Sequence, residues 1–133
     1  MHDTEVSIFI AVPIEQVWAA ITQPVVMRQW MEDNPALEID LRPGGAYSIG
    51  NGETFGRFTK IEAPHTLEYT WRLREWESAV PDSTVTWKLK AVRGGTDVDL
   101  FHDGYPNDSL MFDFEAGWDL NWLGPMKEWL ESQ

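Results

Sequence analysis

The middle of the chain alternates apolar and polar residues with a period of two, which is typical of strands with one buried face. The clearest run is Thr66 to Glu75, where Leu67, Tyr69, Trp71 and Leu73 share one face. Turns rich in glycine and proline separate the runs. Seven strands are predicted, over residues 5–12, 37–41, 46–49, 54–62, 66–75, 84–91 and 97–102. Because consecutive short strands usually pair with their neighbours, an antiparallel meander is expected.

Two short helices are predicted between the first and second strands. Pro13 begins the first, because a proline at this position loses no helical hydrogen bond. Val17 and Trp18 lie on its apolar face. Pro24 ends it and begins the second short helix, which carries Trp30.

The end of the chain predicts one long helix that begins after Asn107 or Asp108 and ends at about Glu131. Apolar residues recur every three to four positions in it: Met111, Phe114, Trp118, Trp122, Met126 and Trp129. Such a stripe must pack on something, and the buried face of the sheet is available. The predicted fold is therefore α+β, a seven-stranded antiparallel sheet wrapped around the long C-terminal helix, in a single domain of residues 1–133.

Composition narrows the function classes. The net charge is −12, with ten basic residues against 22 acidic ones, which argues against nucleic-acid or anionic-membrane partners. There is no cysteine, which excludes disulfides and thiolate metal sites. No apolar stretch approaches the roughly 20 residues that span a bilayer, and the residues from Met1 to Glu5 do not resemble a secretory signal. We expect a soluble, cytoplasmic protein without membrane insertion.

Catalytic motifs are weak. His102 is the histidine on a predicted inward face, and imidazole suits general acid–base catalysis. Asp99 and Asp103 have the opposite parity, so no orienting partner is evident, and a hydrogen-bonded pocket or core residue is the favoured interpretation. Three scattered histidines give no metal-ligand spacing, and neither a Gly-x-Ser-x-Gly elbow nor a phosphate loop is present. No cofactor and no metal are predicted.

The aromatic residues are the strongest functional signal. Eight tryptophans in 133 residues is a high number for side chains that are large and unfavourable to expose. If they line a cavity, it is a site for a small hydrophobic molecule. The alternative is a solid aromatic core. The predicted lining is Trp18, Trp30, Tyr69, Trp71, Trp87, His102, Phe114, Trp118 and Trp122.

Short motifs in a fixed order resemble those of the heat-shock-protein-90 ATPase activator homologue family, in the START-related, birch-pollen-allergen-like (SRPBCC) superfamily. They are Ala11-Val12-Pro13, Val17-Trp18, Trp30, Arg42-Pro43-Gly44-Gly45, Gly56, Glu62-Ala63-Pro64, Tyr69-Thr70-Trp71, Ser83-Thr84-Val85, Gly94-Gly95-Thr96, His102-Asp103-Gly104-Tyr105 and Gly117-Trp118. The resemblance covers nearly the whole chain. It implies a helix-grip fold with a cavity between sheet and helix. Gly124-Pro125 departs from the family's uninterrupted final helix and predicts a kink near Trp122.

Three functions follow as hypotheses. The first is binding of a lipid-like or aromatic molecule in the cavity, without catalysis. The second is a cavity enzyme, of the cyclase, aromatase or hydrolase type, that uses His102. The third is a chaperone-interacting co-regulator, for which an exposed Trp76 is the sequence support. Phe9 and Phe101 have outward parity, which fits a homodimer surface and fits equally well packing under the short helices or a loop.

Overall fold

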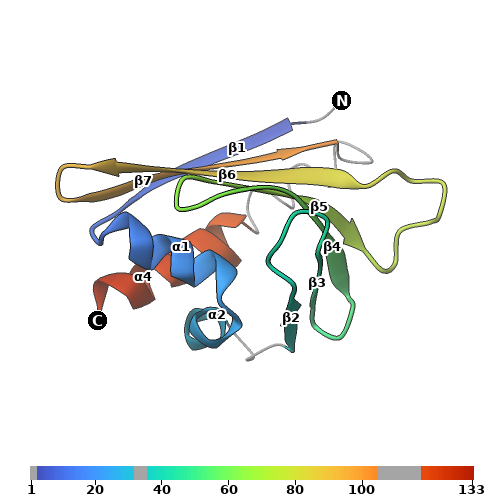
Figure 1. Ribbon diagram of the computed structural model, residues 1–133, viewed down its shortest axis with the longest axis horizontal. Coiled ribbons are helices and arrows are strands. Elements are labelled where there is room, and N and C mark those ends of the chain that lie inside the picture. The colour runs from blue at the N-terminus through green and yellow to red at the C-terminus, as the bar shows by residue number, and fades with distance from the viewer. Residues whose placement is uncertain (1–2, 32–35, 105–117) are drawn as a thin grey trace.

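The computed structural model describes residues 3–31, 36–104 and 118–133, and a seven-stranded sheet is its main element. The strands are β1 (Asp3–Ile10), β2 (Leu37–Ile39), β3 (Ala46–Ile49), β4 (Thr54–Glu62), β5 (Thr66–Leu73), β6 (Ser83–Val92) and β7 (Gly95–Asp103). Their order is β1-β7-β6-β5-β4-β3-β2, and every neighbouring pair is antiparallel. β2 to β7 thus form a meander, and β1 lies beside β7 (Figure 1).

The helices cover one face of the sheet, which we call the inner face (Figure 1). Its buried side chains on β5, β6 and β7 are Leu67, Tyr69, Trp71, Ser83, Val85, Trp87, Leu89, Thr96, Val98, Leu100 and His102. The alternate residues are at least partly exposed, so the period-two pattern identified the two faces correctly. Ala91, which has inward parity, is exposed next to the β6–β7 hairpin.

Strands β1, β2 and β5 end earlier than predicted, and in β1 and β5 the last backbone groups bond elsewhere. β1 ends at Ile10, since the Ala11 N–H donates to the Glu131 carboxylate at 2.8 Å instead of joining the ladder. β5 ends at Leu73, whose carbonyl accepts the Trp76 N–H at 3.0 Å and begins a turn. Neither contact has a local sequence signal.

Two short helices follow β1, as predicted. α1 (Ile14–Thr22) begins directly after Pro13, and α2 (Pro24–Trp30) has its proline at the first position. The indole N–H of Trp30 donates to the Ala20 carbonyl at 2.9 Å, which fixes α2 against α1. Trp30 is thereby held with its ring in the core.

The C-terminal segment changes helical geometry where Gly124-Pro125 predicted a disturbance. η1 (Trp118–Leu123) is a π-helix, and α4 (Gly124–Glu131) is an α-helix with Pro125 in its first turn. Pro125 has no N–H for the carbonyl one turn earlier, so regular α-helix cannot continue through it. The predicted end at Glu131 is confirmed. The predicted helix start and Phe114 lie outside the described residues.

Gly56 lies on β4, between β3 and β5, where a side chain would meet the backbone of β5. The sequence predicts a bulge or bend there, but the register shift lies between Phe58 and Lys60. A Cβ at Gly56 would instead stand 2.0 Å from the Thr70 carbonyl oxygen. Tyr47, directly opposite Gly56 on β3, donates its hydroxyl to that same carbonyl at 2.6 Å. The absent side chain therefore permits the close approach of β5.

We predict that Gly56→Ala destabilises the fold by roughly 3 kcal/mol, because the new methyl group overlaps strand backbone that must move. Gly94→Ala is the matched control: its turn has a φ of +85° but open space around it, and the expected loss is about 1–2 kcal/mol. Urea unfolding of the two variants measures the difference. Equal losses would contradict the steric role of Gly56.

Candidate functional site

Five tryptophans from four separate elements meet on the inner face. We call Trp30 (α2), Trp71 (β5), Trp87 (β6), Trp118 and Trp122 (η1) the tryptophan cluster. Trp118 is central, with ring centroids 5.0 Å from both Trp71 and Trp122 and 6.0 Å from Trp87. Trp30 meets Trp122 edge-on at 5.6 Å. Sequence analysis predicted all five as lining residues, and the structure brings them together.

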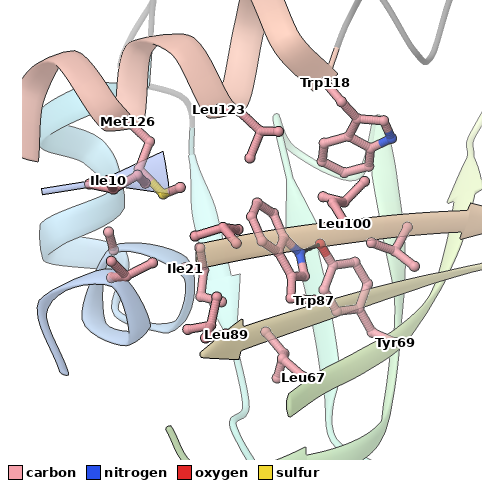
Figure 2. Packing of buried hydrophobic residues seen from close by; sticks show 14 of the residues in the cluster. Ile10, Ile21, Leu67, Tyr69, Trp87, Leu89, Leu100, Trp118, Leu123 and Met126 are labelled. Atoms are coloured by element: carbon pink, nitrogen blue, oxygen red, sulfur yellow. Dashed lines mark hydrogen bonds between the residues drawn. The ribbon is translucent and has the colours of Figure 1, made fainter. Parts of the chain in front are cut away.

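Tyr69 joins this cluster to a second aromatic group. The Trp87 indole N–H donates to the Tyr69 hydroxyl at 2.9 Å, and the two side chains face each other across β5 and β6 (Figure 2). The Tyr69 ring packs 4.9 Å from Tyr47 and 5.9 Å from Phe58. Burial raises the Tyr69 pKa well above its ordinary value, so the phenol stays neutral. Sequence analysis missed Tyr47 and Phe58, because the strands that carry them alternate less clearly.

One predicted lining tryptophan, Trp18, is not part of the cluster. Trp18, on α1, is half-buried against the core and makes no ring contact with the tryptophan cluster among the described residues. Phe114 lies outside the described residues.

A buried chain of hydrogen bonds, which we call the polar relay, lies against the cluster. The Trp118 indole N–H donates to His102 Nδ1 at 3.1 Å, and His102 Nε2 lies 2.8 Å from Ser83 Oγ. Ser83 Oγ in turn donates to the Trp71 carbonyl at 2.9 Å. His102 and Ser83 are both fully buried.

The direction of each bond in the relay follows from its donors. An indole N–H is only a donor, so His102 Nδ1 must be an acceptor and cannot carry a proton. The ring is then neutral with its proton on Nε2, which donates to Ser83 Oγ. Burial agrees with this state, since it lowers the His102 pKa from 6.5 to about 3.

The relay has a chemical consequence. His102 and Ser83 are spaced like a nucleophile and its base, but the base would have to accept the serine proton on Nε2. Here Nε2 already holds a proton, so His102 cannot activate Ser83 in this arrangement. The sequence shows no orienting partner near His102, because its hydrogen-bond partners come from β6 and from η1. The inward parity of Ser83, two residues before Val85, was the available signal.

The described residues also line hollows at the surface. The first is lined by Glu53 and Thr54 with Leu73 to Glu75. The second is lined by residues from 11–15 and from 91–95. The third is lined by Ser7 to Phe9 with Asp97 to Asp99. The second is the largest of the three, at about 370 Å³. None of the three is lined by the tryptophan cluster, whose rings pack directly on one another.

Trp76 and Phe9 were both predicted to lie at the surface. Trp76 is half-buried against the core rather than exposed, and the Arg72 guanidinium donates to the carbonyls of Trp76, Glu77 and Val80 in the same loop. Phe9 is 41% exposed and lies under the Lys127 ammonium, 5.8 Å from the ring centroid. Trp76 is therefore only partly accessible to a chaperone.

The described residues offer neither a metal-binding cluster nor a membrane-spanning helix. Across 3–31, 36–104 and 118–133, no group of three or more His, Cys, Asp or Glu side chains is placed to hold a metal ion. Among the helices of these segments, none has the length and apolar character needed to cross a bilayer.

The relay predicts a specific pH dependence of stability. His102 has a pKa of about 3 when folded and 6.5 when unfolded, so the unfolded chain takes up the proton first. The contribution of neutral His102 is complete above pH 6.5 and is lost as the pH falls towards 3. We expect wild type to lose about 2 kcal/mol more than His102→Gln between pH 7 and pH 5, measured by urea unfolding. His65→Gln removes an exposed histidine and serves as the control. Identical pH profiles for wild type and His102→Gln would contradict the neutral, buried state.

Comparison with solved structures supports the fold. An HSP90 activator from Plasmodium falciparum is 26% identical with a TM-score of 0.89, and the alignment covers 98% of this chain and 96% of that one. Protein CalU16 from Micromonospora echinospora is 23% identical with a TM-score of 0.81, over 96% of this chain and 73% of that one. At that identity the second similarity indicates the fold alone.

Comparison with sequences identifies the family. An uncharacterised protein of Schizosaccharomyces pombe is 31% identical over 64 residues, which is 48% of this chain. The match covers 18% of that protein, so the chain spans about a fifth of the length of this relative. The sequence pattern of the family described as Activator of Hsp90 ATPase homolog 1-like protein matches residues 11–131. The chain therefore belongs to the family of Activator of Hsp90 ATPase homologue 1-like proteins, as the order of its motifs predicted.

Proposed function

We propose that this domain binds a small, largely apolar molecule at the tryptophan cluster, between the inner face of the sheet and the C-terminal helix. One observation carries the proposal. Five tryptophan side chains that are far apart in sequence meet beside the buried polar relay. Small-molecule sites typically combine an apolar, aromatic lining with a few fixed polar groups.

The same surroundings favour an uncharged ligand. The buried polar side chains among the described residues are Thr4, Thr22, Ser83, Thr96 and His102, and none is an acid, a lysine or an arginine. Burying an ion without a partner is strongly unfavourable. A neutral, planar, mostly hydrocarbon molecule avoids that penalty.

Entry at the cluster requires movement of η1, whose Trp118 and Trp122 rings occupy the space. The π-helical geometry of Trp118–Leu123 and the missing N–H of Pro125 make this the least regular part of the C-terminal helix. π-helical turns are frequent at functional sites. A flat ligand the size of an indole ring would take the place of the Trp118 side chain.

Naphthalene is a suitable probe, because it is uncharged and close in size to an indole. We expect saturable shifts of the Trp118 and Trp122 indole N–H resonances in ¹H–¹⁵N NMR titration. The Trp18 and Trp129 resonances are internal controls on half-buried indoles outside the cluster. Shifts confined to these controls, or none at all, would contradict the proposal.

A variant tests the displacement of Trp118. In wild type a ligand must break the Trp118–His102 hydrogen bond, which Trp118→Phe has already lost. Since one such bond contributes about 1 kcal/mol, we expect naphthalene to bind about fivefold more tightly to the variant. Trp129→Phe on the same helix is the matched control. An unchanged affinity of Trp118→Phe for naphthalene would show that the ligand does not displace the Trp118 side chain.

A second candidate function is co-regulation of an Hsp90-type chaperone. It is favoured by the similarity to the Plasmodium falciparum HSP90 activator over 98% of this chain. The test is the steady-state ATPase rate of an Hsp90-type chaperone with and without the domain. A rate increase that Trp118→Phe retains would support a surface interaction independent of the cluster, and no change in rate would contradict this function.

A further inference from the structure

Thr4 carries a buried hydroxyl group that is not part of the polar relay. Its side chain has inward parity on β1 and is 4% exposed. Within the described part of the chain, its hydroxyl oxygen is buried and has no hydrogen-bond partner. Buried hydroxyls are nearly always bonded, since an unsatisfied one is unfavourable to folding. A valine would have the same shape and strand preference without this disadvantage.

The position of Thr4 places it beside the polar relay. Thr4 pairs directly with His102 in the β1–β7 ladder, and His102 pairs with Val85 on β6. Directly opposed residues of an antiparallel pair project from the same face with Cβ atoms about 4.5–5.5 Å apart. η1, which carries Trp118, packs against β1 as well. Thr4 and His102 are therefore neighbours at the end of the inner face that Trp118 covers.

We infer that Thr4 and His102 form a hydrogen-bonding subsite for an uncharged hydroxyl group carried by an aromatic ligand. The inference rests on the proposed function. When such a ligand takes the place of the Trp118 ring, His102 Nδ1 loses the indole donor and can accept a hydrogen bond from the ligand instead. A ligand hydroxyl donates to this nitrogen and accepts from the Thr4 hydroxyl, so it satisfies both groups.

This pairing selects among ligand classes. A bare hydrocarbon satisfies neither Thr4 nor the vacated His102 Nδ1. A ketone oxygen accepts from Thr4 but offers nothing to Nδ1. A carboxylate meets no buried cation among the described residues. The subsite thus favours phenol-like molecules over hydrocarbons, ketones and acids of the same ring system.

Three probes with one ring system test the subsite: naphthalene, 2-naphthol and 2-naphthoate. In NMR titrations of wild type at pH 7, we expect 2-naphthol to bind at least fivefold more tightly than naphthalene, and 2-naphthoate to bind more weakly than 2-naphthol. In Thr4→Val the preference for 2-naphthol should fall at least threefold, while naphthalene binding stays within twofold of wild type.

Thr96→Val is the matched control. Thr96 is also a fully buried strand threonine, but its hydroxyl donates to the Val12 carbonyl at 2.9 Å. We expect it to lower the melting temperature and to leave the probe preference unchanged, whereas Thr4→Val should keep or raise the melting temperature. A 2-naphthol preference that survives Thr4→Val, or tight binding of 2-naphthoate, would overturn the subsite and leave the proposed function standing. Absence of binding by all three probes would overturn both.

Discussion

The hydrogen bond from the Trp118 indole to His102 fixes the C-terminal helix on the sheet, and much of the interior depends on it. It determines which His102 nitrogen carries the proton, and so sets the direction of the bond to Ser83 and onward to the Trp71 carbonyl. One contact therefore connects η1 with β5, β6 and β7. Because buried polar atoms must find partners, a change at any member of this chain leaves another unsatisfied.

The same hydrogen bond limits what His102 can do chemically. In this arrangement His102 is neutral and both of its ring nitrogens are in hydrogen bonds, so it cannot accept the Ser83 proton. Its surroundings are aromatic rings in edge-on and tilted contact, on which the proposal of a flat, neutral ligand rests. The π-helical turn of η1 packs on these rings and is less regular than the α-helical turns of α4 that follow it.

The architecture was largely predictable because it depends on local signals. The alternation along β5 identified Leu67, Tyr69 and Trp71 as buried, and they are. Pro13, Pro24 and Gly124-Pro125 marked the beginnings of α1 and α2 and the disturbance in the last helix. Errors arose where distant groups intervene, as at the end of β1, where Glu131 takes the Ala11 N–H.

The sequence by itself determined the order of the elements, the inward face of each central strand and the aromatic character of the interior, since each depends on spacing within one segment. It could not determine that Ser83 meets His102, because that contact depends on the register between β6 and β7. Nor could it place Thr4 beside His102 or aim the Trp118 indole at Nδ1. Those choices belong to the tertiary structure, because strand register and helix docking are fixed by contacts between segments that are far apart in the chain.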